Sequence, residues 1–506
     1  MKIDSFFDFS SSPRLCEILQ TVWVGRFVGI CISTERIGYR INMKRFLILT
    51  VCLLFAGLTA CGKKEEEPYI EPEPVAVYNP EKPTTLVLAE YGNNNKRSEA
   101  LRLIADKYEY DNPNVTIEMI DFPKSLDEGQ RILQAGDKID IFEVNDSTAS
   151  SFINSGHAAE ITDYTDEWMD GYTISIGAKW SMHYYDRDRT YFIPNTIFGK
   201  ALYYRADLLE KEELPIPRFF HTVDSFGKQV MENEGVEYGL VMPLAEENRY
   251  KIADYFIWSN VGMGNIADIG NAYFVKDDSS KTVFSLPAAK DALETLKKLY
   301  STLGPSSALE MSDEDTAQIF ADGKTFMAIS DSKGIDVCES KLDDDDWIVY
   351  PLPLGAADLG VIPNEFQGWA INSGAENEPA AGGFLLYLSN SDNTTYLARL
   401  TGSIPIHSDA IELDKFFSDS HFSGFQLLAN RAAIGLYHYV DAPKKYDAFL
   451  EYEAEINERY GAFFRGEVEA EELLSELDAY WTKAYEDEGQ LWKTKPVVVE
   501  KEESKK

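Results

Sequence analysis

Two short motifs are the first places in this sequence where chemistry could reside. Residues 262–267, Gly-Met-Gly-Asn-Ile-Ala, match the G-x-G-x-x-A pattern of dinucleotide-binding loops. They follow a helix-like segment instead of a strand, with no basic residue nearby to meet a phosphate, so we interpret them as a helix-ending turn. The run Asp343 to Asp346 suggests calcium. It lacks the alternating ligands, central Gly and closing Glu of a calcium loop, which favours a solvated acidic loop.

Signatures of catalysis are missing from the rest of the sequence. There is no G-x-S-x-G elbow, no H-E-x-x-H motif and no P-loop, and the six histidines never recur at metal-ligand spacing. Cys338 stands alone in the later part of the chain, and a lone cysteine is more often a small buried hydrophobe than a nucleophile. The sequence therefore predicts a protein that is not an enzyme, with no catalytic residue, no metal and no cofactor.

Composition and charge narrow the class of protein further. The 506 residues are 44% hydrophobic and carry a formal charge of -37. This composition is globular, and the length allows about two or three folding units. A surface this acidic repels phosphate backbones, and no run rich in Lys or Arg offsets it locally, so we expect no nucleic-acid partner.

An export signal precedes the globular part. Met43, Lys44 and Arg45 form a basic start, and residues 46–60 are uncharged and apolar, too short a run for a spanning helix. The sequence then reaches Leu58-Thr59-Ala60-Cys61, which resembles the lipobox of bacterial lipoproteins, whose cysteine becomes the lipidated N-terminal residue. We expect residues 43–60 to be a signal peptide, residues 1–42 to be an extension created by a start codon assigned too early, and Cys61 to anchor the mature protein to a membrane.

Strand and helix signals alternate after a tether rich in Glu and Pro at 61–84. The β-α-β-α-β order of the first segments predicts an α/β fold with a largely parallel sheet. These segments are strands at 86–88, 115–119 and 139–144, with helices at 98–111 and 127–134 between them. We further expect strands at 201–204, 238–241 and 325–329, helices at 287–302 and 379–389, a mainly helical chain after about 410, and a loose charged tail at 491–506.

Several motifs occur in a fixed order along the chain. The best is Tyr191-Phe192-Ile193-Pro194 leading to residues 201–208, Ala-Leu-Tyr-Tyr-Arg-Ala-Asp-Leu; others are Gly156 to Thr162, Phe320 to Lys324, Gly368 to Asn372 and Gly402 to Pro405. From Thr85 to about Trp481 the set resembles the family 1 extracellular solute-binding proteins of bacterial ABC importers, to which maltose-binding protein belongs.

The resemblance implies two α/β lobes joined by about three hinge strands, which close on a ligand in the cleft between them. The crossings are expected near 198–201, 366–370 and 402–405. Lobe 1 would comprise residues 85–198 and 370–402, and lobe 2 would comprise residues 201–365 and 405–490.

The ligand is expected at the loops that follow strands, since open α/β lobes bind ligands outside the carboxyl ends of their strands. A sugar site needs planar hydrogen-bonding groups together with aromatic platforms, and these loops hold both. Trp369 is expected to stack on a sugar ring, with Asp146 and Asp331 accepting hydroxyl protons from opposite lobes. Phe198 replaces a position that is often polar in the family. The predicted ligand residues are Asn93, Asn145, Asp146, Phe198, Asn248, Tyr250, Asp331, Gln367 and Trp369.

The function implied is capture of a mono- or oligosaccharide by a monomeric, lipid-anchored protein on the extracytoplasmic face of the cell membrane. The protein would deliver the sugar to the membrane subunits of an ABC permease. Two alternatives stay open: a ligand-sensing subunit that takes no part in transport, and a surface glycan-degrading enzyme, which would need two opposed carboxylates in one cleft.

Overall fold

The computed structural model describes residues 80, 82–92, 95–136, 138–166, 168–267, 270–363, 365–430 and 436–489. The chain divides into two units, Met1–Glu73 and Pro74–Lys506, and every described residue belongs to the second. The predicted N-terminal extension, signal peptide and Cys61, nearly all of the tether, Asn93 and the tail at 491–506 lie outside the described residues. None of the described helices is long and apolar enough to cross a membrane.

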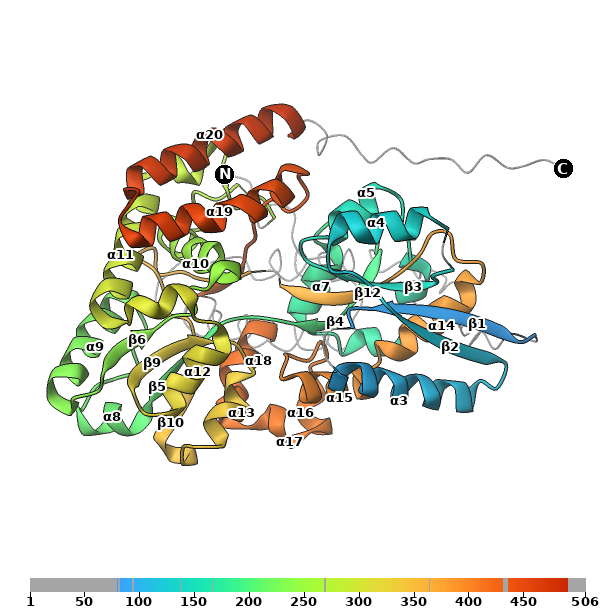
Figure 1. Ribbon diagram of the computed structural model, residues 1–506, viewed down its shortest axis with the longest axis horizontal. Coiled ribbons are helices and arrows are strands. Elements are labelled where there is room, and N and C mark those ends of the chain that lie inside the picture. Colours follow the sequence, from blue (N-terminus) through green and yellow to red (C-terminus); the bar gives the residue numbers. More distant parts are fainter. Residues whose placement is uncertain are drawn as a thin grey trace, which may run out of the picture. The chain divides into compact units, whose positions relative to one another are not determined.

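The first of two large sheets has five strands, in the order β2-β1-β3-β12-β4. β1 runs parallel to β2 and β3, whereas β12 runs antiparallel to β3 and β4. The strands are β1 (Thr84–Glu90), β2 (Val115–Asp121), β3 (Ile141–Asn145), β4 (Phe192–Ile197) and β12 (Phe366–Ile371). With α3 (Asn95–Asp111) and α4 (Leu126–Gln134) as connections, the predicted β-α-β-α-β unit is confirmed (Figure 1).

Helices pack around this first sheet to form lobe 1. α14 packs against β12 and α3, α15 packs against α3 and β4, and α7 packs against β4. The helices of this lobe are α5 (Ala149–Asn154), α6 (Thr162–Asp166), η2 (Met169–Tyr172), α7 (Ile176–His183), α14 (Glu378–Leu388) and α15 (Ser391–Thr401). α14 has a proline in its first turn, as predicted for the helix at 379–389. Proline is favoured there because backbone N–H groups of the first turn have no acceptor within the helix, so its missing N–H costs nothing.

The second large sheet has four strands, in the order β10-β5-β9-β6, and forms the centre of lobe 2. Its strands are β5 (Ala201–Arg205), β6 (Tyr238–Val241), β9 (Thr325–Ser330) and β10 (Trp347–Pro351). Its helices are α8 (Ala206–Lys211), α9 (Phe220–Glu234), η3 (Glu246–Asn248), α10 (Arg249–Val261), η4 (Val283–Ser285), α11 (Pro287–Leu303), η5 (Ser306–Glu310), α12 (Asp313–Ala321), α13 (Gly334–Glu339) and η6 (Asp344–Asp346). The strands and helices predicted over this stretch are confirmed.

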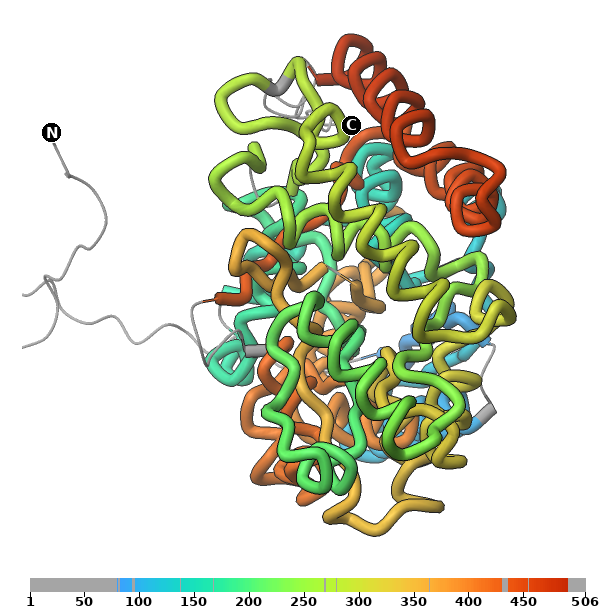
Figure 2. The backbone as a smooth tube through the Cα atoms, turned by 90° about the vertical axis from the view of Figure 1, so that its left-hand side faces the viewer, coloured from blue at the N-terminus to red at the C-terminus, as the bar shows by residue number. Residues whose placement is uncertain are grey.

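The last part of the chain is mainly helical, but it contains one strand that the sequence did not predict. β13 (Tyr437–Tyr439) pairs with β11 (Gly360–Ile362), and a further small sheet joins β7 (Phe274–Val275) to β8 (Asp278–Thr282). The helices are α16 (Ala410–Leu413), α17 (Lys415–Ser418), η7 (Ser420–Phe422), α18 (Ser423–Asn430), α19 (Ala448–Arg465) and α20 (Ala470–Glu488). α19 packs against α10 and α20 packs against α11, as Figures 1 and 2 both show.

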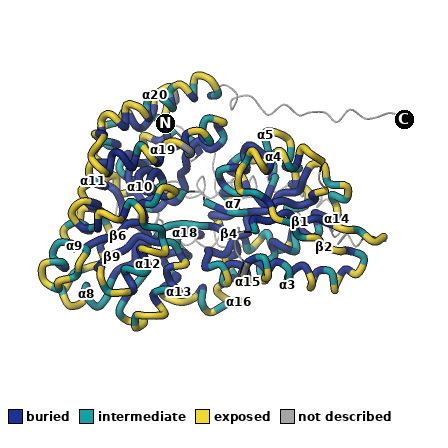
Figure 3. The backbone as a smooth tube through the Cα atoms, in the orientation of Figure 1, coloured by how far each residue is buried: buried dark blue, intermediate teal, exposed yellow. Residues whose placement is uncertain are grey.

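Buried residues lie on the strands and along one side of many helices, as the colouring of the backbone in Figure 3 shows. Trp481, which is fully buried, anchors α20 among the aromatic rings of Tyr273 and Tyr452. Cys338 is also fully buried, as expected for a small hydrophobe. Gly262 ends α10 with a φ of +79°, so the motif at 262–267 is the predicted helix-ending turn.

The chain passes between the two large sheets through segments that are bonded to one another. Ile197 and Ile404 exchange two backbone hydrogen bonds of 3.0 and 3.1 Å, and the Phe198 amide donates to the Glu365 carbonyl at 2.9 Å. Residues 198–200 lead from β4 to β5, and the return path enters β12 at Phe366. The second crossing therefore lies before Phe366, whereas the sequence predicted it within residues 366–370.

Candidate ligand-binding site

Each large sheet has an edge at which a strand ends opposite the start of its antiparallel neighbour. In lobe 1, β3 ends at Asn145 and pairs with Gln367 near the start of β12, which brings Asp146 and Glu365 to the same edge. In lobe 2, β9 ends at Ser330 opposite Ala201, the first residue of β5, which brings Asp331 and Lys200 together. The crossing at 198–200 joins these two edges, and Lys200 and Glu365 line one pocket beside it, so the two edges face a common region.

A cavity in this region is lined by charged groups and aromatic side chains. Its walls come from α10, from the segment before β12, and from the loop between β13 and α19. The lining residues are Tyr250, Lys251, Asp254, Trp258, Pro363, Glu365, Asp441, Ala442 and Lys444.

Lys444 connects the two lobes. Its ammonium lies 2.6 Å from the Asp146 carboxylate of lobe 1 and 2.9 Å from the Asp441 carboxylate, and its side chain is only 4% exposed. Ser150, in α5 of lobe 1, donates a hydrogen bond of 2.7 Å to the Lys444 carbonyl. Burial opposes the charged form, but the two carboxylates hold the pKa of Lys444 well above its ordinary value, so the side chain stays protonated.

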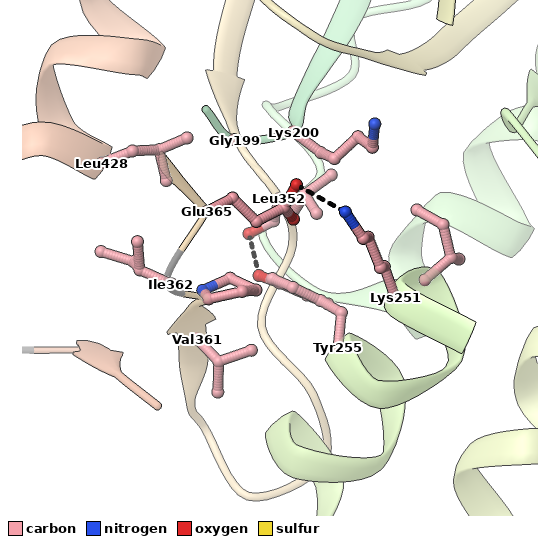
Figure 4. Close-up of a pocket in the computed structure, with 11 residues that line it drawn as sticks. Gly199, Lys200, Lys251, Tyr255, Leu352, Val361, Ile362, Glu365 and Leu428 are labelled. Atoms are coloured by element: carbon pink, nitrogen blue, oxygen red, sulfur yellow. Dashed lines mark hydrogen bonds and ion pairs between the residues drawn. The ribbon is translucent and has the colours of Figure 1, made fainter. Parts of the chain in front are cut away.

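Lys251 and Glu365 form a second ion pair, which is half-buried, at 3.2 Å. Figure 4 shows the two side chains pointing toward each other, beside Lys200 and Tyr255. Burial would raise the pKa of Glu365, yet the neighbouring Lys251 and Lys200 ammonium groups hold it down at about 2. Glu365 is therefore ionised at neutral pH.

A third charged group lies at the edge of lobe 2. Lys200 pairs with Asp313 at 2.6 Å, and the Asn248 side-chain amide donates to the same carboxylate at 3.1 Å. Burial, together with the neighbouring Asp313 charge, raises the pKa of Asp331 to about 6. Asn248 and Asp331, both predicted ligand residues, are thus linked through Asp313 and Lys200.

Glu453 on α19 makes another bridge between the lobes. Its carboxylate accepts a hydrogen bond of 2.7 Å from the Tyr250 hydroxyl and one of 3.1 Å from the Ser147 hydroxyl. Tyr250 belongs to lobe 2 and Ser147 follows β3 of lobe 1, so one carboxylate is shared by donors from both sides.

The remaining predicted ligand residues occupy other surroundings. The side-chain oxygen of Asn145 accepts hydrogen bonds from the backbone amides of Ser147 and Thr148, at 3.1 and 2.9 Å. These bonds fix the loop that carries Asp146. Phe198 lines a separate pocket next to the crossing. Gln367 lies within β12 between Asn145 and Thr196. The structure therefore brings together Asp146 and Tyr250 at the cavity, with Asn248 and Asp331 near Lys200.

Trp369 lies inside lobe 1, enclosed by its neighbours. It is fully buried in β12, and the Arg97 guanidinium lies over its ring at 5.3 Å from the centroid. Arg97 in turn pairs with Glu90 at 2.9 Å and with Glu143, which is itself fully buried. The ring is therefore inaccessible to a ligand in this conformation, and stacking would require this charged network to separate from it.

The charged residues that dominate the cavity were missed by sequence reasoning. Lys444 and Asp441 follow β13, so the rule that ligands bind after strands would have selected them. That strand is three residues long and lies in a stretch that was assigned to helix. Lys251 and Glu365 were each within two residues of a predicted position, Tyr250 and Gln367, and only the pairing between distant segments distinguishes them from surface charges.

A model of the family described as bacterial extracellular solute-binding protein matches residues 104–424. A binding protein of Brucella abortus (strain 2308) is 20% identical over 347 residues, which cover 68% of this chain and 80% of that protein. Proteins similar to this chain by family and by fold are thus solute-binding proteins, not enzymes.

Solved structures share the fold. Maltose-bound MalE3 of T. maritima is 20% identical with a TM-score of 0.63, and the match covers 80% of this chain and 99% of that one. The sugar-binding protein MalE of Xanthomonas citri is 16% identical with a TM-score of 0.65, covering 81% and 100%. A solute-binding protein of Agrobacterium radiobacter K84 in complex with ribitol is 17% identical with a TM-score of 0.62, covering 80% and 99%. These matches confirm the predicted two-lobe α/β fold.

The burial of Trp369 leads to a prediction about its replacement by alanine. We expect Trp369→Ala to lower the free energy of unfolding by about 3 to 5 kcal/mol, because it leaves a cavity in lobe 1. Affinity for ligand should change less than about fivefold in the folded fraction, whereas a stacked aromatic would be worth about 1 to 3 kcal/mol of binding. Urea melts and calorimetric titration measure the two quantities.

Trp481→Ala is the matched control, because Trp481 is equally buried and lies in α20. It should lose similar stability and keep wild-type affinity. If Trp369→Ala kept wild-type stability and lost ligand affinity, the stacking role would be restored.

Proposed function

The chain belongs to the bacterial extracellular solute-binding family, as its sequence indicated, and from this premise we propose that it captures a sugar or oligosaccharide and delivers it to an ABC importer. The observation that carries the sugar assignment is the pairing of Asp146 with Lys444 beside Tyr250. A hydroxyl group both donates and accepts hydrogen bonds, so a ligand hydroxyl beside this pair can donate to the carboxylate and accept from the ammonium group.

The names of the structural neighbours support a polyhydroxyl ligand. One is described as maltose-bound, one as sugar-binding and one as a complex with ribitol. The ligand site that we propose comprises Asp146, Asn248, Tyr250 and Asp331 from the sequence prediction, together with Lys251, Glu365, Asp441 and Lys444.

Ligand exchange would require the two lobes to move apart about the crossing segments. The two ion pairs and the Glu453 bridge lie between the lobes, and segments joined by few connections move unless a large apolar interface holds them. We propose lobe 1 at residues 85–198 and 370–402 and lobe 2 at residues 201–365 and 405–490, with one change: the start of the second lobe 1 segment moves from 370 to Phe366, because all of β12 pairs within the first sheet, and Glu365 then lies at the crossing.

The site of action that we propose is the extracytoplasmic face of the cell membrane. The basic, apolar and lipobox succession that ends at Cys61 supports a lipid anchor, with synthesis starting at Met43. A monomer held there could hand its ligand to the permease subunits in the same membrane.

A thermal-shift screen against sugars and sugar alcohols tests sugar capture. A ligand at 100 times its dissociation constant stabilises the protein by roughly 2.7 kcal/mol, which raises the melting temperature measurably. Asp146→Asn should abolish most of the shift, because the carboxylate that accepts the ligand hydroxyl is lost.

Asp111→Asn, at an exposed site in α3, is the control and should keep the full shift. If no sugar or sugar alcohol raised the melting temperature of the wild-type protein, the proposed ligand class would be refuted.

The lipid anchor is tested by Cys61→Ala expressed from Met43. The wild-type protein should sediment with membranes and yield a lipidated N-terminal peptide starting at Cys61 in mass spectrometry, whereas the variant should be released. A variant that still sediments wholly with membranes, or a mature N-terminus that maps before residue 61, would contradict the proposal.

A further inference from the structure

Acidic side chains outnumber basic ones around the cavity. Those of Asp146, Asp254, Glu365, Asp441 and Glu453 line it or touch its lining residues, against those of Lys251 and Lys444, while the nearby Lys200 pairs with Asp313. Burial raises the pKa of Asp254 well above its ordinary value and that of Asp441 to about 7, so the approach of a cation favours their charged forms. Both lysines are already bonded, Lys251 to Glu365 and Lys444 to Asp146 and Asp441. In the described part of the chain, Asp254 and Glu453 form no ion pair.

Asp254 holds an acceptor that no group of the protein uses. The residue lines the cavity from α10 and is 1% exposed. One carboxylate oxygen accepts the Tyr273 hydroxyl, while the other oxygen, Oδ1, has no hydrogen-bond partner in the described structure. A buried acceptor without a partner destabilises the protein, and a donor supplied by a ligand removes that penalty.

Glu453 is satisfied only by neutral donors, the hydroxyls of Tyr250 and Ser147. Two aromatic rings, Tyr250 and Trp258, also line the cavity. Aromatic faces attract cations as well as sugar rings. The cavity thus combines an unused carboxylate oxygen, a carboxylate without a cation and two aromatic side chains.

We propose that the ligand carries a protonated amine, as in an amino sugar, and that the ammonium group binds beside Asp254 between Tyr250 and Asp441. This inference rests on the proposed function and narrows its substrate class. An ammonium group donates three hydrogen bonds. It also supplies a positive charge to acidic side chains that Lys251 and Lys444, already paired elsewhere, do not neutralise. A neutral hydroxyl supplies a donor without the charge, and a ligand carboxylate would be repelled by the surplus of acidic groups.

Monosaccharides that differ in one substituent test the inference. The probes are glucosamine, glucose, N-acetylglucosamine and glucuronate, with the corresponding galactose series, each titrated calorimetrically at a pH where the amine is protonated. We expect the amine to bind at least about tenfold more tightly than its neutral partner of the same ring, and the uronate to bind most weakly. Raising the salt concentration should reduce the difference.

Two variants connect this preference to the residues named. Asp254→Asn should narrow the affinity ratio between glucosamine and glucose toward one. Asp254 is buried against Tyr273, so its replacement also disturbs the fold. Glu453→Gln, at a half-buried position, is therefore a second variant, and it should narrow the same affinity ratio. Asp111→Asn, exposed on α3, should leave the ratio at its wild-type value.

The outcomes separate this inference from the proposed function. If neutral sugars bound as tightly as amines, or if only neutral sugars bound, the amine assignment would be wrong and sugar capture would stand. Tighter binding of the uronate would likewise overturn the amine assignment. If no carbohydrate of any charge bound, the amine assignment and the proposed function would both fail.

Discussion

The Lys444 ammonium group, held between Asp146 of lobe 1 and Asp441 of lobe 2, is the interaction on which the arrangement of the cavity depends. Removing an ammonium group from water costs several kcal/mol, and only close carboxylates with satisfied hydrogen bonds offset that cost. Residues 146–150, which lead into α5, must therefore keep their position against residues 440–447, and the hydrogen bond from Ser150 to the Lys444 carbonyl helps to hold them there.

The crossings between the sheets make this register possible. The hydrogen bonds of Ile197 with Ile404 and of Phe198 with Glu365 hold three separate chain segments side by side. Because β12 begins where β3 ends, Glu365 reaches the edge that carries Asp146 and meets Lys251 of lobe 2. Few chain segments connect the two lobes. A movement about these crossings would therefore separate the charged pairs without unfolding either lobe.

Local signals in the sequence were sufficient for most of the elements but for only part of the site. Alternating apolar residues marked β2, and prolines marked the starts of α11 and α14. β13 was missed because three residues give no readable period. Lys444 and Asp146 are separated by 298 positions, so their pairing follows from tertiary structure alone. Trp369 is aromatic and next to a crossing, yet Arg97 covers its ring.

A double-mutant cycle between Asp146 and Lys444 tests the central claim most directly. The free energy of unfolding is measured in urea for Asp146→Asn, Lys444→Met and the double variant. The account predicts a coupling energy above about 1 kcal/mol, because either single change leaves a buried charge without its partner across the lobes. Additive effects, within about 0.3 to 0.5 kcal/mol, would show that the two side chains do not interact and would contradict the account.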